Sequence, residues 1–168
     1  ELSTGYWEFN FNDDIRTSPA VTAFQGEFGK DIRAAINYGI NDAWLIEEIS
    51  NGMAIESHSP LPPNMWGALY PPDITDYSYD LEKAQDLMEG AGYSATNMLP
   101  LELVLSEGDT AKASAEAVQL QLADCYIDMD FTQYDFWDMI TEIGPDRSEW
   151  DVFSIGWIGD NGNPESIV

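Results

Sequence analysis

The chain has 168 residues, and its 31 Asp and Glu residues against 6 Lys and Arg residues give a formal net charge of −25 at pH 7. With 44% hydrophobic residues, including 7 Phe, 8 Tyr and 6 Trp, the chain can bury a core, which excludes a disordered acidic tail. Six basic residues are too few to neutralise a nucleic acid, and no run of about 18 apolar residues is present that could span a membrane.

A strand and a helix are predicted at the start of the chain. Apolar and polar side chains alternate over residues 6–12, which predicts a strand with Trp7, Phe9 and Phe11 on one face. Apolar residues then recur at helical spacing, and the stripe consists of Ile32, Ala35, Ile36, Gly39 and Ile40. We therefore expect a helix that buries this stripe.

A second helix and a long loop are predicted next. Asn41 or Asp42 can cap the helix, and Gly52 can end it. Its apolar side chains are Trp44, Leu45 and Ile49. Residues 53–79 contain several prolines and show little periodicity, although Leu, Ile, Met, Trp and Tyr are frequent. We expect a long loop that is too apolar to be a solvated linker.

The middle of the chain predicts a well-bounded helix and a strand. Asp80 is expected as the N-cap of a helix that ends near Ala91, where Gly92 supplies the left-handed residue. The buried stripe of this helix comprises Ala84, Leu87, Met88 and Ala91. Residues 99–105 are mostly apolar and predict a strand.

Another helix is expected to open at Asp109 or Thr110. Its apolar stripe consists of Ala111, Ala115, Val118, Leu122 and Cys125. Cys125 therefore lies on the core face, where a free thiol behaves as a small hydrophobic group. Because no basic residue is evident beside it to lower its pKa, we do not expect a reactive thiol.

The last part of the chain predicts a strand, a helix and a final strand. A half-buried strand is indicated where Asp128 and Asp130 separate Ile127, Met129 and Phe131. Residues 132–135 resemble a capping box for a helix that carries Phe136, Trp137 and Ile140. Residues 151–157 form an apolar strand, and the alternation of strands with helices predicts an α/β layer structure.

A series of motifs occurs in a fixed order along nearly the whole chain. They are Phe9-Asn10-Phe11-Asn12, residues 31–40, Gly52, residues 61–67, residues 79–84 and residues 91–93. In these motifs the chain resembles the second lobe of the peptide/nickel-class (family 5) extracellular solute-binding proteins of ABC importers, and it is most similar to dipeptide-binding proteins. The resemblance implies a periplasmic-binding-protein-like α/β lobe with helices packed on a mixed β-sheet. One departure is Cys125-Tyr126-Ile127, where the family usually turns through a glycine.

Residues 1–168 are accordingly expected to form a single, partial α/β lobe of a larger two-lobed protein. The resemblance places that protein outside the cytoplasm at the cell surface, with an export signal and a lipid anchor outside this chain. A monomer is expected. We attribute the acidic composition to adaptation to molar salt, where a Debye length of about 3 Å screens the repulsion between surface carboxylates.

The candidate ligand-binding site is the turn that follows the final strand. Residues 157–164 contain two glycines, which free the backbone, and a proline, which stops further sheet pairing. In α/β proteins, ligands bind at the carboxyl ends of strands. The resemblance implies that Asp160 holds the amino terminus of a peptide ligand and that Trp157 lines the same cleft. Gly159 would let the ligand approach the backbone, and Asn161 completes the candidate set. Periodicity alone leaves Trp157 open to a role in the core.

The resemblance further implies that the protein captures small peptides and passes them to an ABC transporter permease in the membrane. Dipeptide-binding relatives neutralise the ligand carboxylate with an arginine, but residues 105–109 in the matching loop contain no basic residue. The cation could therefore come from the other lobe, or the ligand could be a longer peptide. A nickel chelate, a haem or an oligosaccharide is the alternative class of ligand.

An enzyme is not expected, although an acidic hydrolase is the competing class. With 31 acidic residues, paired carboxylates arise by chance and carry little information. The single histidine, His58, lies in a loop without a nucleophile motif, and one histidine with one cysteine does not define a zinc site. Residues 160–163 lack the spacing of a calcium loop, and no nucleotide-binding motif is present. We therefore expect neither a cofactor nor a bound metal.

Overall fold

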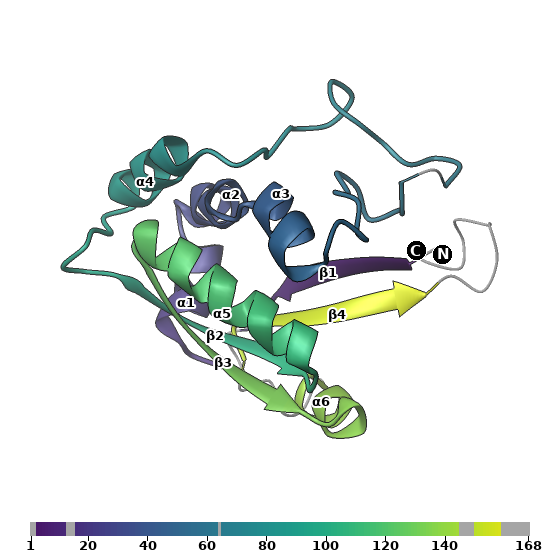
Figure 1. The fold of residues 1–168 in the computed structure, drawn as a ribbon. Coiled ribbons are helices and arrows are strands. Elements are labelled where there is room, and N and C mark those ends of the chain that lie inside the picture. The colour runs from purple at the N-terminus through teal and green to yellow at the C-terminus, as the bar shows by residue number, and fades with distance from the viewer. Residues whose placement is uncertain (1–2, 13–15, 64, 145–149, 159–168) are drawn as a thin grey trace.

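The computed structural model describes residues 3–12, 16–63, 65–144 and 150–158 (Figure 1). Its elements are β1 (Ser3–Phe9), α1 (Pro19–Gln25), α2 (Gly29–Gly39), α3 (Asp42–Trp44), the π-helical turn η1 (Leu45–Ile49), α4 (Leu81–Gly90), β2 (Leu99–Ser106), α5 (Asp109–Asp124), β3 (Ile127–Tyr134), α6 (Phe136–Glu142) and β4 (Val152–Ile158). Within these ranges the strands form a four-stranded sheet in the order β1-β4-β2-β3, and no helix is long and apolar enough to cross a membrane. The predicted α/β fold with helices packed on a mixed sheet is confirmed.

The sheet has a parallel part and an antiparallel part. β2 runs parallel to β3 and pairs with it along its whole length. β4 also runs parallel to β2, but the pairs that join these two strands end at Leu105↔Ser154. Beyond that point β4 pairs with the antiparallel β1, and residues 3–6 and 155–158 continue as a two-stranded extension that we call the outer ribbon (Figure 1).

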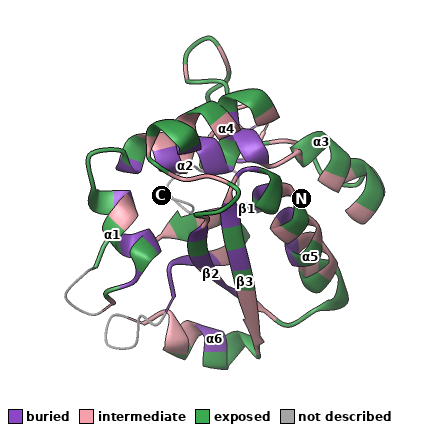
Figure 2. Ribbon diagram, turned by 90° about the vertical axis from the view of Figure 1, so that its left-hand side faces the viewer, coloured by how far each residue is buried: buried purple, intermediate pink, exposed green. Residues whose placement is uncertain are grey.

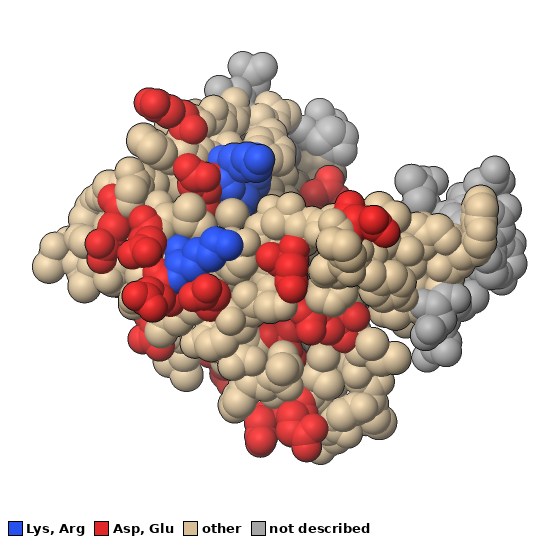
Figure 3. Space-filling model, turned by 90° about the horizontal axis from the view of Figure 1, so that it is seen from above, with Lys and Arg blue, Asp and Glu red and all other residues tan. Residues whose placement is uncertain are grey.

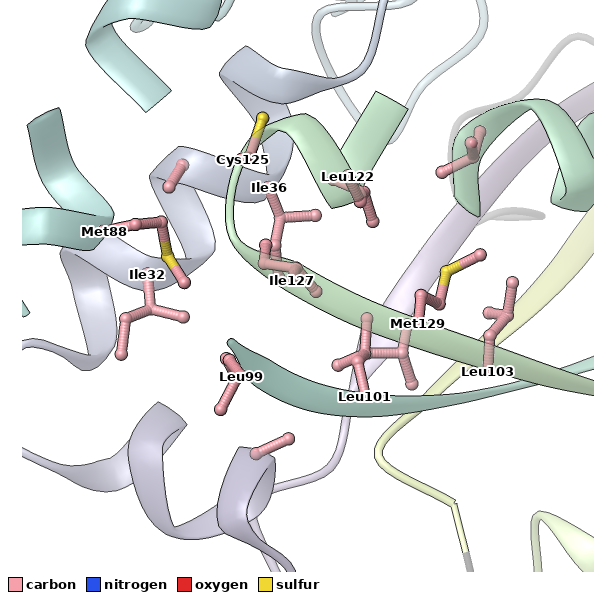
Figure 4. Close-up of a cluster of buried hydrophobic side chains, with 14 of the residues drawn as sticks. Ile32, Ile36, Met88, Leu99, Leu101, Leu103, Leu122, Cys125, Ile127 and Met129 are labelled. Carbon is pink, nitrogen blue, oxygen red and sulfur yellow. The ribbon is translucent and has the colours of Figure 1, made fainter. Parts of the chain in front are cut away.

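The main core lies between the sheet and helices α1, α2, α4 and α5. Alternate residues of β2 and β3 point toward these helices, and Figure 4 shows them meeting side chains of the helices. The labelled members are Ile32, Ile36, Met88, Leu99, Leu101, Leu103, Leu122, Cys125, Ile127 and Met129. Gly39 allows α2 to approach α5 closely, because a Cβ at this position would lie 2.5 Å from Cys125 Sγ. The predicted stripes of α2, α4 and α5 are confirmed as core-facing.

The opposite face of the sheet carries a smaller core beneath α6. Its buried members are Val104, Met139, Trp150 and Phe153. Elsewhere on this face Thr132 Oγ1 donates a hydrogen bond to Glu102 Oε1 at 2.8 Å. Figure 2 shows buried residues concentrated on the strands and on the inner side of α2, whereas α3 has none. The helices therefore cover the two faces of the sheet unequally.

Side-chain caps confirm two of the predicted helix starts. Asp80 Oδ1 accepts from Lys83 N at 3.0 Å at the start of α4, and Gly92 follows the end of this helix with φ +91°. Asn41 Oδ1 accepts from Trp44 N at 3.0 Å at the start of α3. Local capping chemistry therefore fixes both helices where the sequence predicts them.

The predicted start of α5 is confirmed at Asp109, which is the first helical residue. Gly108 is the N-cap, so Asp109 and Thr110 already lie in the helix. The cap adopts φ +154°, which side chains disfavour, and Gln133 Nε2 donates to its carbonyl oxygen at 3.4 Å. Backbone conformation therefore sets this helix start in place of a capping side chain.

The capping box predicted over residues 132–135 does not form. Thr132 belongs to β3, and its hydroxyl is bonded across the sheet to Glu102. Asp135 caps α6 instead, because its Oδ1 accepts from Trp137 N at 3.0 Å. Strand pairing with β2 therefore outweighs the local capping motif.

The first strand lies closer to the N-terminus than predicted. Trp7 and Phe9 pack against the main core as expected. Phe11 lies beyond β1 and is 52% exposed, so its predicted place on the buried face is wrong. Asn10 Nδ2 donates to Trp150 O at 2.9 Å, so a bond to a distant segment replaces strand pairing directly after Phe9.

The described residues between 53 and 79 form the predicted long loop. Met65 is buried, as expected for a loop that packs on the fold. Met53, Ile55 and Trp66 are 84%, 70% and 84% exposed, so the expectation of packing is wrong for these three side chains.

The turn between α5 and β3 holds a tyrosine in the left-handed region. Tyr126 has φ +64°, at the position where the resemblance has a glycine. This conformation costs a residue with a Cβ about 1–2 kcal/mol. Tyr126 Oη donates to Glu89 Oε1 at 3.1 Å, so the side chain makes a contact that a glycine could not.

Candidate ligand-binding site

β4 carries the candidate site at its carboxyl end, and the strand changes character along its length. Val152 and Phe153 at its start are buried. Trp157 and Ile158 at its end are 47% and 65% exposed. The strand therefore runs from the core into the outer ribbon, where it presents large apolar side chains at the surface.

Trp157 lies on the α6 side of the sheet. Successive strand residues point to opposite faces, so Trp157 shares its face with Phe153 and Ile155, which belong to the smaller core. Across the ribbon it pairs with Thr4. Neither core contains Trp157, and about half of its surface is accessible among the described residues. Its contact with a ligand stays a prediction.

The other three candidate residues, Gly159, Asp160 and Asn161, lie outside the described residues. The roles assigned to them therefore stay predictions. The structure defines the strand end from which the chain continues toward them, and it defines the neighbours of that end.

The opposite end of β4 is held by a buried carboxylate that the sequence analysis did not identify. Asp151 is 2% exposed, and Arg16 Nε donates to its Oδ1 at 2.8 Å. Ser18 Oγ donates to the same oxygen, and Glu102 N donates to Oδ2 at 2.8 Å. A buried charge requires a charged partner and further hydrogen bonds, and Asp151 has both.

The Asp151 anchor, as we call these contacts, joins three segments that are distant in sequence. Asp151 N donates to Glu102 O in β2, and Asn10 N donates to Asp151 O. Ser18 is also the N-cap of α1, where its Oγ accepts from Val21 N at 3.0 Å. The anchor thus fixes the base of β4, the strand that carries Trp157. An acidic residue directly before an apolar strand was the sequence signal that could have revealed it.

The loop after β2 lies at the same edge of the sheet as the end of β4. Because β2, β3 and β4 are parallel, their carboxyl ends point the same way. The loop is closed by Glu107 N, which donates to Tyr134 O at 2.8 Å. Lys112 follows in the first turn of α5, 57% exposed and 3.7 Å from Glu116 Oε1. Lys112 lies just beyond residues 105–109, the loop in which the resemblance places an arginine, so this cation was not predicted.

Negative charge dominates the surface. Figure 3 shows Asp and Glu spread over the face seen from above, with Lys and Arg confined to small areas. Three described cations are engaged within the fold, namely Arg16 with Asp151, Arg33 Nη1 with Phe24 O at 2.6 Å and Lys83 Nζ with Tyr38 Oη at 2.7 Å. At low ionic strength such a surface attracts the cationic end of a ligand more than the anionic end.

A group of titratable side chains surrounds His58. His58 Nδ1 lies 3.9 Å from Glu56 Oε1. Desolvation and the charge of Glu56 together raise the pKa of Asp42 to about 6, against the opposing charge of His58. Across the residues that the structure describes, no three or more His, Cys, Asp or Glu side chains are arranged to hold a metal ion.

Cys125 has the environment predicted for an unreactive thiol. It is fully buried, and its Sγ donates to Gln121 O at 3.5 Å. Burial, with a further contribution from the nearby charge of Asp124, raises the pKa of the thiol to about 11. The thiol therefore stays protonated at neutral pH.

Comparison with known proteins points to one family. The family model described as "Bacterial extracellular solute-binding proteins, family 5 Middle" matches residues 1–168. The chain is 28% identical over 173 residues to the dipeptide-binding protein of Escherichia coli K12, a match that covers 99% of this chain and 29% of that protein. It is 29% identical over 140 residues to heme-binding protein A of Haemophilus influenzae, which covers 82% of this chain and 25% of that protein.

A solved structure has the same fold. The ABC transporter-associated periplasmic binding protein DppA of Helicobacter pylori, in complex with the peptide STSA, matches 99% of this chain with a TM-score of 0.74 and 26% sequence identity. The match covers 29% of that protein, so the chain spans less than a third of the proteins it matches. The expected periplasmic-binding-protein-like fold is confirmed.

Proposed function

The chain belongs to the bacterial extracellular solute-binding proteins of family 5, and we propose that it forms part of one lobe of a receptor that captures short peptides for an ABC importer. A relative named for dipeptide binding and a relative solved with a bound peptide support a peptide ligand. Because the chain spans 29% of these relatives, peptide capture is assigned to the larger, two-lobed protein. The family consists of solute receptors, which supports a binding role over an enzymatic one.

The proposed receptor works outside the cytoplasm. Its family is extracellular, which supports this location. We assign it a lipid anchor at the cell surface and a monomeric state. It delivers its ligand to the permease in the membrane, and a separate ATPase drives transport.

The amino terminus of the ligand is assigned to the turn after β4. A peptide α-ammonium has three donors, and the Asp160 carboxylate can accept two of them in bonds worth about 1.5–3 kcal/mol each. Trp157 offers the cation an accessible aromatic face. Gly159 lets the ligand approach the main chain, and Asn161 adds an amide. The observation that carries this proposal is an exposed tryptophan at the carboxyl end of a strand whose base is anchored.

The carboxylate of a short peptide requires a cation, and Lys112 is a described residue that can supply one. Its ammonium is more than half exposed and is paired with Glu116 on the helix surface. Such an exposed pair is worth about 0–1 kcal/mol, so a ligand carboxylate can replace Glu116. A cation from the other lobe and a longer peptide are the alternatives.

A non-peptide ligand is the second candidate. The Haemophilus influenzae relative is named for heme binding, and an accessible tryptophan face also suits a planar ligand. A nickel chelate or an oligosaccharide belongs to the same alternative. Native mass spectrometry of the full-length protein, purified without refolding, would identify the ligand that co-purifies.

Calorimetry on the full-length protein tests the peptide proposal. The wild type should bind free-amine di-alanine and tetra-alanine, and it should bind their N-acetylated forms poorly. Asp160→Asn should weaken binding of the free-amine peptides by about 1.5–3 kcal/mol. Asp128→Asn, an exposed carboxylate change on β3, is the matched control and should bind like the wild type. Equal affinity of the wild type and Asp160→Asn for the free-amine peptides would contradict the role assigned to Asp160.

A further inference from the structure

Asn51 and Gly52 form the turn that ends η1, and an Asn-Gly pair has a chemistry of its own. The main-chain nitrogen of the glycine can attack the side-chain Cγ of the asparagine, because glycine has no side chain that hinders the approach. Asparagine is for this reason one of the thermally labile residues of proteins. The fold around the turn then decides how fast the reaction runs.

The closed turn holds the attacking nitrogen in a hydrogen bond. Gly52 N donates to Ile46 O at 2.8 Å. Asn51 and Gly52 both lie in the left-handed region, with φ +52° and φ +70°. The attack requires Gly52 N to give up its hydrogen, and the bond to Ile46 O opposes that loss. The closed turn therefore protects Asn51.

The segment that carries this turn is weakly held in the fold. Neither α3 nor η1 contains a buried residue. Trp44 is 43% exposed, and the side chains of Asn51 and Met53 are exposed as well. Segments with few buried contacts open locally at a low cost in free energy. The bond from Gly52 N should therefore break more often than the bonds of the core.

The surroundings of the turn leave room for the reaction. A Cβ at Gly52 would have one described atom within 4 Å, which is Glu47 Oε2 at 3.9 Å. No described main chain or bulky side chain therefore blocks the approach at Gly52. Asn51 is exposed, so water also reaches it.

We propose that Asn51 is a site of spontaneous deamidation and that the opening of η1 sets its rate. In the opened turn, Gly52 N forms a bond to Cγ of Asn51. The side-chain amide nitrogen leaves Cγ with the hydrogen of Gly52 N, as ammonia, and a cyclic succinimide remains. Water then adds to either ring carbonyl and opens the ring, which gives Asp or isoaspartate at position 51. Water is the only co-reactant, and no oxidant or reductant takes part.

Both products favour the opened turn. The new carboxylate lies at the C-terminal end of η1, where the helix dipole disfavours negative charge. Glu47 and Glu48 already place negative charge in this turn. Isoaspartate also adds an atom to the main chain between η1 and the loop that follows. Deamidation should therefore release the start of that loop from the helix end.

Peptide mapping by mass spectrometry of the full-length protein tests the proposal. The wild type is incubated at mildly alkaline pH, in buffer and in urea, and Asp and isoaspartate at position 51 are measured over time. Modification should be at least about tenfold faster in urea, because unfolding removes the bond to Ile46 O. Asn97 is exposed and precedes Met98, so it is the internal control and should react far more slowly in urea than Asn51.

Two cap variants test whether opening of the helix controls the rate. Asn41→Ala removes the side-chain cap of α3, so Asn51 should react several-fold faster in buffer and at the wild-type rate in urea. Asp80→Ala removes the cap of α4 and is the matched control, which should keep the wild-type rate in buffer. An unmodified Asn51 in both buffer and urea would overturn the site. Equal rates in buffer and urea, or equal acceleration by both variants, would overturn its control by η1.

Discussion

β2 and the outer ribbon belong to one sheet, but different constraints determine their residues. Leu99, Leu101 and Leu103 of β2 are 0%, 2% and 1% exposed and pack against helices. In the ribbon, Trp157 is 47% exposed and Ile158 is 65% exposed. Contacts within the chain explain the residues of β2. The large apolar side chains at the surface of the ribbon lie outside both cores.

Two glycines show the same difference. At Gly39 in the core, a Cβ would lie 2.5 Å from Cys125 Sγ, so helix packing requires the glycine. At Gly5 in the ribbon, no described atom would lie within 4 Å of a Cβ. Packing among the described residues therefore requires the glycine at position 39 and does not require the one at position 5.

Removing the anchor between the two regions should have the largest effect. Asp151→Ala takes away the buried counter-charge of Arg16 and the acceptor for Ser18 Oγ, so the free energy of unfolding should fall by about 3–5 kcal/mol. Chemical denaturation followed by circular dichroism measures the change. Asp138→Ala, an exposed carboxylate change on α6, should cost less than about 0.5 kcal/mol. Similar losses in both variants would contradict the anchor.

The same glycine-to-alanine change should act differently in the two regions. Gly39→Ala should lower the free energy of unfolding by about 1–3 kcal/mol, because its Cβ overlaps Cys125 Sγ. Gly5→Ala should not destabilise the fold. Adding Cys125→Ala should recover part of the Gly39→Ala loss in a double-mutant cycle. Additive losses in that cycle would disprove the close contact between α2 and α5.

Two tryptophans sharpen the comparison further. Trp150 is 7% exposed in the smaller core, so Trp150→Ala should cost about 3–5 kcal/mol of stability. Trp157→Ala should cost about 1 kcal/mol or less, because its side chain is half exposed, and it should weaken peptide binding. Thermal unfolding and calorimetry of the two variants provide the test. If Trp157→Ala loses as much stability as Trp150→Ala, Trp157 is a core residue.

Salt and pH act on the acidic surface that both regions share. Raising KCl from 0.01 M to about 1 M shortens the Debye length from about 30 Å to about 3 Å, so the melting temperature should rise. The pKa of Asp42 is about 6 in the fold against an ordinary 3.8, so the folded state binds more protons between these values. Stability should therefore fall as pH rises from about 4 to 6 and level off above.

One control variant separates the effect of pH from the effect of salt. Asp42→Asn should remove part of the pH dependence and should leave the salt dependence intact, since many other carboxylates carry the surface charge. A melting temperature that does not change with salt at neutral pH would reject adaptation to molar salt.

Sequence periodicity predicted the elements that have one buried side. The stripe of α4 and the apolar run of β2 repeat at the period of their own secondary structure, so local sequence records their burial. Phe11 was misplaced because a bond between Asn10 and Trp150 replaces strand pairing there. Bonds of that kind depend on tertiary structure, which no local pattern contains.

The features of the candidate site also fall into two groups, those that local sequence predicts and those that depend on tertiary structure. The position of Trp157 at the end of an apolar strand follows from local sequence, and its exposure does not. The pairing of Gly5 with Gly156 depends on the register between β1 and β4, which local sequence does not contain. The Asp151 anchor depends on three segments that meet only in the folded chain.

The hydrogen bonds that hold the base of β4 join residues far apart in the chain, with separations of 133 for Ser18–Asp151 and 140 for Asn10–Trp150. Closing loops of this size loses chain entropy before the contacts form, which makes such pairings slow. During synthesis, β1 leaves the ribosome long before β4. The edge of β1 therefore has no strand partner until β4 has been made. Within this chain the outer ribbon therefore cannot form until β4 has been made, and the contacts at the base of β4 form only with it.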